Sequence, residues 1–402
     1  MCETNKPQCE YWQKDLQPKP ETALDESNKT WQPEDWQWLA FTELNLRFSQ
    51  SRQLIQRWPD IGALFYEVDL SCLAHILSGQ QLRVWRELRR VGLAHHLQKQ
   101  YRWLEQHSAQ LITWHDARFP ESLKQIEDCP GWLWVQGNAQ LLQDPAVAMV
   151  GGRRASPSGL ALAREYGQFL ASAGLTIISG LALGIDGASH QGALDAGGDT
   201  IAVLGSGLAE IYPARHQHLA ADIVAKGGAL VSPWPLFLEA RPHQFPVRNS
   251  IVSGLSLGVL VVEAAPKSGS LITAKLALEQ GREVFALPSS AYNRQAQGSL
   301  GLIRDGACLV YSPQQIIAEL APVLTGLLKP YNPPSPEGKE ELQQHLAPQL
   351  QQLLNQFGYD PLPVDIICQQ MALPYAEVAT LLMELTLLGY VAEAEQGFER
   401  IR

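Results

Sequence analysis

Four short apolar runs, each ending in small or charged residues just before a segment of helix length, constrain the fold of this chain more than any other feature. The runs and the residues that follow them are 147–150 with Gly151-Gly152-Arg153, 176–178 with Ser179-Gly180, 201–204 with Gly205-Ser206-Gly207, and 259–262 with Glu263. Apolar runs separated by amphipathic helical segments are typical of βαβ units and a parallel sheet. We therefore predict an α/β fold built on an extended, Rossmann-type doubly wound parallel sheet.

The turns after these runs predict an anion or phosphate site. Ligands of open α/β sheets bind beyond the carboxyl ends of the strands, where small residues and helix N-termini expose backbone N–H groups. The turn at residues 151–159 fits neither the dinucleotide fingerprint nor the triphosphate loop. Arg153 in this turn could instead grip a phosphate with two hydrogen bonds. The alternative is a surface arginine that follows a tight turn.

Two later motifs also indicate contacts with a nucleic acid. Phe245, Arg248 and Asn249 place a ring, a cation and an amide within five residues. Ring stacking combined with phosphate contact is how proteins hold single strands without strong sequence preference. The Ser268–Ser270 turn, with Gly269 between its two serines, can both cap a helix and cradle an anion.

A further glycine-containing segment begins at Ser179. In it Asp186 and His190 are four residues apart, which places them one helical turn apart on the same face. An acid and an imidazole on one helix face are compatible with catalysis. Structural hydrogen bonding is the alternative, and the spacing identifies no nucleophile with its base. We expect the structural role.

Charge and composition narrow the class of protein. The net charge is −10, but residues 146–330 carry +1 and residues 340–402 carry −7, so most of the negative charge lies away from the glycine-rich turns. No run approaches the roughly 20 apolar residues of a membrane helix, and we expect a cytoplasmic protein without membrane contact. The six scattered cysteines lack metal-site spacing, which favours buried or free thiols over disulfides or zinc. We expect no metal and no cofactor.

The chain divides into five predicted parts. Residues 1–30 are polar and predict a disordered tail. Residues 31–110 predict short helices; their Arg and Lys residues between 83 and 102 are either a solvated helix face or a supplementary DNA contact. Residues 111–320 hold the sheet, with a connecting segment at 111–145. Four prolines in nine residues indicate a linker at 330–339, and residues 340–402 form the last part.

The last part has the pattern of a winged helix. We expect helices at about 340–356, 364–371 and 374–388, followed by strands near 389–391 and 398–401. The presumed recognition helix carries Glu377 and Glu384 and no Lys or Arg. Because reading a duplex requires cations against phosphate, a protein-binding or structural role is favoured.

Taken in order, these motifs resemble the DNA-processing protein A family (DprA, also called Smf). The resemblance covers about 180 central residues and rests on Val150-Gly-Gly-Arg153 with Ser156 and Gly159, residues 179–186, 200–205, Tyr212-Pro213, residues 245–249, Val262-Glu263, residues 268–274, 282–288 and 302–307. The flanks agree, because the family often carries an N-terminal helical domain, similar to a SAM or helix-hairpin-helix domain, and a C-terminal winged helix.

The resemblance implies a homodimer that binds and protects single-stranded DNA and helps to load a RecA-type recombinase during natural transformation. It implies no catalytic residue. From the turns and the resemblance together we predict DNA contacts at Gly151, Arg153, Ser156, Gly180, Gly205, His243, Phe245, Arg248, Asn249, Ser268, Gly269 and Ser270. Ser250 and Pro242 stand where the family carries an arginine and a lysine, which removes two cations from the implied phosphate path.

An enzyme is the competing hypothesis. Related Rossmann proteins that resemble the lysine-decarboxylase-like phosphoribohydrolases process nucleotides with a PGGxGTxxE turn. The corresponding turn here, residues 265–270, lacks the paired glycines and the downstream glutamate. DNA binding is therefore favoured.

Overall fold

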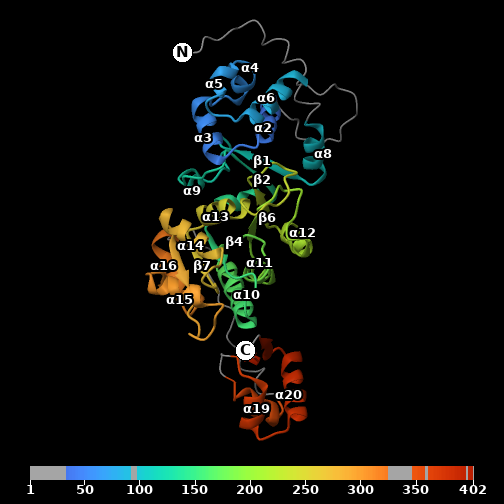
Figure 1. Ribbon diagram of the computed structural model, residues 1–402, viewed down its shortest axis with the longest axis vertical. Helices are drawn as coiled ribbons and strands as arrows, with labels where there is room; N and C mark the ends of the chain where they lie inside the picture. The colour runs from blue at the N-terminus through green and yellow to red at the C-terminus, as the bar shows by residue number, and fades with distance from the viewer. Residues whose placement is uncertain (1–32, 92–96, 325–345, 358–360, 395–396, 402) are drawn as a thin grey trace.

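The computed structural model describes residues 33–91, 97–324, 346–357, 361–394 and 397–401 (Figure 1). The predicted disordered tail at 1–30 and the predicted linker at 330–339 lie outside these residues.

A nine-stranded sheet forms the centre of the molecule, in the order β1-β2-β6-β5-β4-β3-β7-β8-β9. The strands are β1 Ala109–Thr113, β2 Trp132–Gly137, β3 Ala146–Val150, β4 Thr176–Ser179, β5 Thr200–Val203, β6 Ala229–Ser232, β7 Gly258–Val261, β8 Glu283–Ala286 and β9 Cys308–Leu309. In this sheet order, every neighbouring pair from β6 through β5, β4, β3, β7 and β8 to β9 is parallel. The strand order reverses between β3 and β7, which pair from Val147–Gly258 to Val150–Val261. The predicted doubly wound sheet is confirmed.

The connecting segment extends this sheet. β2 pairs antiparallel with β6, and β1 pairs antiparallel with β2. The first four residues of β2 are buried. β1 was not predicted, because it is an edge strand with only Ile112 buried, and its pattern is correspondingly weak.

Helices cover both faces because successive residues of a buried strand point to opposite sides. Val147 and Met149 on β3 join the core beneath one set of helices, α10 Pro157–Ser172, α11 Ile185–Asp195 and α16 Pro313–Leu324. Ala148 and Val150 join the core beneath the other set, α13 Gln244–Gly254 and α14 Ser270–Glu279. Shorter elements at the edges are α9 Glu121–Lys124, η3 Ala214–His216, α12 Gln217–Ala225 and α15 Gln297–Arg304.

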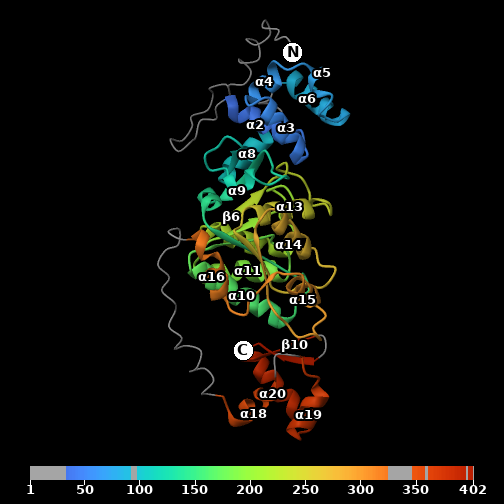
Figure 2. The same cartoon turned by 90° about the vertical axis from the view of Figure 1, so that its left-hand side faces the viewer.

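The N-terminal helices lie beside one edge of the sheet (Figure 2) and share a hydrophobic core with it. They are α2 Pro33–Glu43, α3 Phe48–Arg57, α4 Ile61–Tyr66, α5 Leu70–Leu73, α6 Gly79–Val91 and α8 Gln98–Gln106. Phe41 on α2 meets Trp132 on β2 edge to face, with ring centroids 5.7 Å apart. Lys99 on α8 lies over the ring of Phe237, with its Nζ atom 3.8 Å from the centroid.

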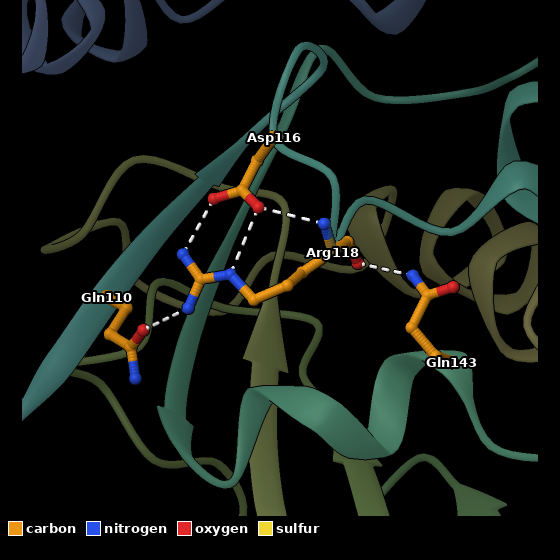
Figure 3. Close-up of polar contacts among 4 residues, drawn as sticks. All are labelled: Gln110, Asp116, Arg118 and Gln143. Atoms are coloured by element: carbon orange, nitrogen blue, oxygen red, sulfur yellow. Dashed lines mark hydrogen bonds and ion pairs between the residues drawn. The ribbon is translucent and has the colours of Figure 1, made fainter.

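A polar network braces the connecting segment (Figure 3). Arg118 donates from Nε and Nη2 to both carboxylate oxygens of Asp116, at 3.0 and 2.6 Å, and from Nη1 to Gln110 on β1 at 2.6 Å. Gln143, in η2 Ala139–Gln143, donates to the carbonyl oxygen of Arg118 at 2.7 Å. The hydrogen bonds to Asp116 raise the pKa of Arg118. The network therefore ties the edge strand to η2.

The winged-helix unit, described at 346–357, 361–394 and 397–401, contains α18 Pro348–Leu354, α19 Val364–Met371, α20 Tyr375–Leu387, β10 Val391–Ala394 and β11 Gly397–Arg400. Its first described helix begins at Pro348, and the predicted helix start at 340 lies outside the described residues. β10 and β11 lie against α10 (Figure 2). In the described part of the chain no single helix is long and apolar enough to span a membrane, although the bent pair α19 and α20 passes that test together.

The cysteines depart in part from expectation. Cys129, Cys308 and Cys368 are free, as predicted. Cys72 is disulfide-bonded, so the prediction is wrong at this position. Disulfide pairing depends on spatial proximity, which spacing along the chain does not reveal.

Candidate nucleic-acid interface

An aromatic ring flanked by guanidinium groups lies at the carboxyl edge of the sheet. Phe245 is in the first turn of α13, and the guanidinium carbons of Arg153 and Arg248 lie 5.6 and 5.9 Å from its ring centroid. The ring of Tyr212 is tilted by 53° at 5.7 Å and is half exposed. We call Phe245, Tyr212, Arg153 and Arg248 the Phe245 cluster. Its residues come from the loops after β3 and β5 and from α13, which follows β6 in the chain.

Two glycines from neighbouring strand ends make room for this cluster. A Cβ atom at Gly180 would overlap the guanidinium of Arg248, and one at Gly205 would lie 2.7 Å from Cδ1 of Phe245. Both glycines were predicted as site residues because small residues permit close approach. Here the approaching groups are side chains of the chain itself. The structure thus brings together Arg153, Gly180, Gly205, Phe245 and Arg248.

Arg248 differs from Arg153 because it is only 4% exposed, whereas Arg153 is exposed. Its Nη1 donates to the carbonyl oxygen of Val203 at the end of β5, at 2.6 Å. Burial lowers the pKa of Arg248 to about 10, although the nearby Asp186 opposes this shift. In the structure this guanidinium braces strand ends and is not presented to solvent.

Asp186 is the buried counter-charge. Its carboxylate accepts hydrogen bonds from the backbone N–H groups of Gly180 and Ala182 at 3.1 and 3.3 Å. Burial raises the pKa of Asp186, and the charge of Arg248 opposes that shift. These contacts hold the turn after β4, which favours the structural role over the catalytic one.

His190 is fully buried on α11. Thr200 donates its hydroxyl proton to the carbonyl oxygen of Ile177 at 2.7 Å, so the 2.7 Å contact between Thr200 Oγ1 and His190 Nδ1 requires a proton on Nδ1. Burial lowers the pKa of His190 to about 3, with the nearby His216 and Arg248 acting in the same direction. His190 is therefore neutral and structural.

We expect the neutral state of His190 to make stability depend on pH. Below its ordinary pKa of 6.5 the unfolded chain takes up a proton that the folded chain excludes until about pH 3. The free energy of unfolding should therefore fall on acidification, by about 2 kcal/mol between pH 6.5 and 5. Urea titrations at these two pH values measure the loss. His190→Asn, which keeps a donor toward Thr200, should lose less, and equal losses in both proteins would contradict the assignment.

The turn at 151–159 binds a carboxylate of its own chain. Glu263, at the end of β7, is buried and accepts from the backbone N–H and the hydroxyl of Ser156, at 2.9 and 2.5 Å. Its carbonyl oxygen accepts from the N–H of Gly152 at 2.6 Å. Ser156 also accepts from the N–H of Gly159 and so caps α10. These donors therefore already bind acceptors of the chain itself, at the ends of β3 and β7 where the strand order reverses.

The other predicted residues lie on α13 or near the starts of α10, α13 and α14. His243 is exposed just before α13, and Asn249 is half-buried on that helix. Ser268 and Ser270 share a hydrogen bond of 2.6 Å between their hydroxyls at the start of α14, which packs beside α13. Gly269 between them is exposed, and Gly151 packs against Ile185. His243 and Asn249 thus share α13 and its start with Phe245, whereas Gly151 lies two residues before Arg153 and Ser268–Ser270 begin the neighbouring helix α14.

Sequence reasoning did not select Tyr212 as a site residue. The Tyr212-Pro213 pair belongs to the family resemblance, but the distance of 33 residues between Tyr212 and Phe245 conceals their contact. Within the described ranges no group of three or more His, Cys, Asp or Glu residues is arranged to hold a metal ion.

The fold and the site define an α/β protein of the Rossmann type with an aromatic and cationic cluster at its strand ends and a C-terminal winged helix. The sequence profile described as DNA recombination-mediator protein A matches residues 110–321, and that of the DprA winged helix domain matches 335–397. The chain belongs to the DNA recombination-mediator protein A (DprA/Smf) family.

Individual relatives agree with this assignment. Protein Smf of Escherichia coli K12 is 44% identical over 302 residues, which cover 75% of this chain and 79% of that protein. The DNA processing protein DprA of Streptococcus pneumoniae R6 is 42% identical over 204 residues, which cover 51% of this chain and 72% of that protein. The crystal structure of DprA from Streptococcus pneumoniae has a TM-score of 0.61 at 34% identity and covers 70% of this chain and 96% of that one.

Proposed function

We propose that this protein binds single-stranded DNA along the carboxyl edge of its central sheet. The observation that carries the proposal is the Phe245 cluster, in which an accessible tyrosine and an exposed arginine adjoin a phenylalanine ring. Every base has a face that can stack on such a ring, and the cation attracts the adjoining phosphate. The net charge of the chain is −10, and its winged-helix recognition helix carries no Lys or Arg. These features favour binding of a single strand at a small site over binding of a duplex along an extended basic surface.

The predicted contacts then divide into two roles. We assign direct contact to Arg153 and Phe245, and add Tyr212. Arg248 becomes a positioning residue, because its buried guanidinium supports the loops beneath the ring. The flanking residues remain proposed contacts along the path, a set that comprises Gly151, Ser156, His243, Asn249, Ser268, Gly269 and Ser270.

The cellular role that we propose rests on family membership. Relatives are named DNA processing proteins, and the family description is that of a recombination mediator. Protection of incoming DNA and loading of a RecA-type recombinase in natural transformation, in the cytoplasm, follow as proposals. Recombinase filament assembly on strands coated with single-strand-binding protein tests the loading. We propose no enzymatic activity, in keeping with the structural hydrogen bonds of Asp186 and His190.

We also propose a homodimer. Ile272 and Leu278 on α14 are 43% and 60% exposed, although they are apolar. A second copy could cover them, and two linked sites would raise the effective concentration for a long strand. Sedimentation that shows only monomer at micromolar concentration, together with affinity independent of oligonucleotide length, would contradict this proposal.

A gel-shift titration with a single-stranded oligonucleotide, beside a duplex of equal length, tests DNA binding. We expect preference for the single strand. Arg153→Ala should weaken binding and reduce the slope of log affinity against log salt by about 0.7 for each lost phosphate contact. Arg154→Ala, an exposed neighbour of equal charge, is the matched control. Equal slopes in all three proteins would remove Arg153 from the DNA path.

A further inference from the structure

The first turn of α10 holds a carboxylate from the winged-helix unit. The backbone N–H of Ser158 donates to Oε1 of Glu399 on β11 at 2.5 Å, across 241 residues of sequence. Glu399 is only 2% exposed, and both strands of its hairpin lie against α10. A charged side chain is buried at this depth only when it is well partnered. The contact is thus an ordered junction between the two units.

This position lies on the turn at 151–159, which also carries a residue of the proposed DNA path. Arg153 lies five residues before Ser158 on the same turn, and its guanidinium adjoins the ring of Phe245. Two other N–H groups of this turn have acceptors within the sheet domain. The N–H of Ser156 donates to Glu263, and the N–H of Gly159 donates to Ser156. The N–H of Ser158 instead faces an acceptor that arrives from another unit.

A carboxylate here meets the same requirements as a phosphate. α10 begins at Pro157, which has no N–H, and the N–H groups of Gly159 and Leu160 bond to Ser156, so the N–H of Ser158 is the donor that the first turn offers to an outside acceptor, at the positive end of the dipole of a 16-residue helix. The unit that supplies Glu399 is strongly acidic, with a charge of −7 over residues 340–402. The negative charge of this unit repels a nearby DNA strand as long as Glu399 is bound at the N-terminus of α10.

We propose that the first turn of α10 is a phosphate-binding position of the DNA path, and that Glu399 occupies it when DNA is absent. The winged-helix unit thereby competes with the strand, and DNA binding releases it from α10. This inference rests on the proposed binding of single-stranded DNA. It assigns the acidic unit a regulatory contact with the chain's own DNA site.

Glu399→Gln in the full chain tests the competition, because it removes the charge and keeps the shape. The matched control is Glu393→Gln, which makes the same charge change at an exposed position on the neighbouring strand β10. Affinity for a fluorescent oligothymidylate at low salt is measured by anisotropy. Loss of a charge-assisted contact at a helix terminus should tighten binding of Glu399→Gln by about three- to tenfold relative to Glu393→Gln. In small-angle X-ray scattering, the maximum dimension of the wild-type protein should increase when the oligonucleotide is added.

The outcomes separate the two proposals. Equal affinities of the Glu399→Gln and Glu393→Gln chains, with the wild type still binding the oligonucleotide, would overturn the competition and leave the proposed function intact. The absence of binding in every chain would overturn both. Glu399→Ala is the second variant if Glu399→Gln folds poorly, and circular dichroism checks its folding. Tighter binding by this variant, with scattering that shows separated units before DNA is added, supports the competition.

Discussion

Arg248→Ala is expected to lower the free energy of unfolding by about 3–5 kcal/mol, the scale found when one of two interacting buried charges is removed. The substitution leaves Asp186 buried with backbone donors but without its cation, and it removes the donor to Val203. Urea denaturation at pH 7 measures the loss. A loss below about 1 kcal/mol would show that the strand ends do not depend on this guanidinium.

Two controls isolate the cause of this loss. Arg153→Ala removes an exposed guanidinium that adjoins the same ring and should change stability by no more than about 0.5 kcal/mol. Arg248→Ala combined with Asp186→Asn should cost less than the sum of the two single changes, because the partners interact. Binding by Arg248→Ala must be measured where the variant is folded, since a positioning residue also acts through the fold.

Phe245→Ala is expected to weaken binding of single-stranded DNA by about 1–3 kcal/mol, the range found when one stacked base loses its ring. Phe245 is the ring that both Arg153 and Tyr212 adjoin, so its removal dismantles the cluster. Anisotropy titrations with an oligothymidylate, which has no competing structure of its own, measure the effect.

Size-matched variants separate stacking from packing. Phe245→Leu fills much of the same space beside Gly205 but has no aromatic face, so it should bind nearly as weakly as Phe245→Ala. Phe245→Tyr keeps the face and should retain most of the affinity. Wild-type affinity in Phe245→Leu would show that the side chain supports the loop and does not stack on a base.

Much of the fold was predictable because its determinants are local. The apolar runs at 147–150, 176–178, 201–204 and 259–262 correspond to β3, β4, β5 and β7, since strands buried on both faces are continuously apolar. Residues 364–371 coincide with α19, and residues 374–388 contain α20. In each case the signal lies within the segment that forms the element.

The candidate site was predictable only in part, because its geometry depends on contacts between segments that are distant in the sequence. Residue type and spacing selected Phe245 and Arg248 together, but residue type does not show how deeply a side chain is buried. Arg248 is buried because α13 crosses the ends of β4 and β5, whose glycines lie 68 and 43 residues earlier in the chain. The depth of that side chain is a property of the assembled sheet.

The sequence alone determined the doubly wound sheet, the position of its glycine-rich turns and the acidic winged helix, because periodicity and charge can be read along one segment. Three features depend on contacts between distant segments of the folded chain: Arg248 supports the ring while Arg153 is exposed, Tyr212 contacts Phe245, and Glu399 accepts from the N–H of Ser158. These contacts join residues from 33 to 241 positions apart, and such distant partners are selected by packing and by the need to satisfy buried charge.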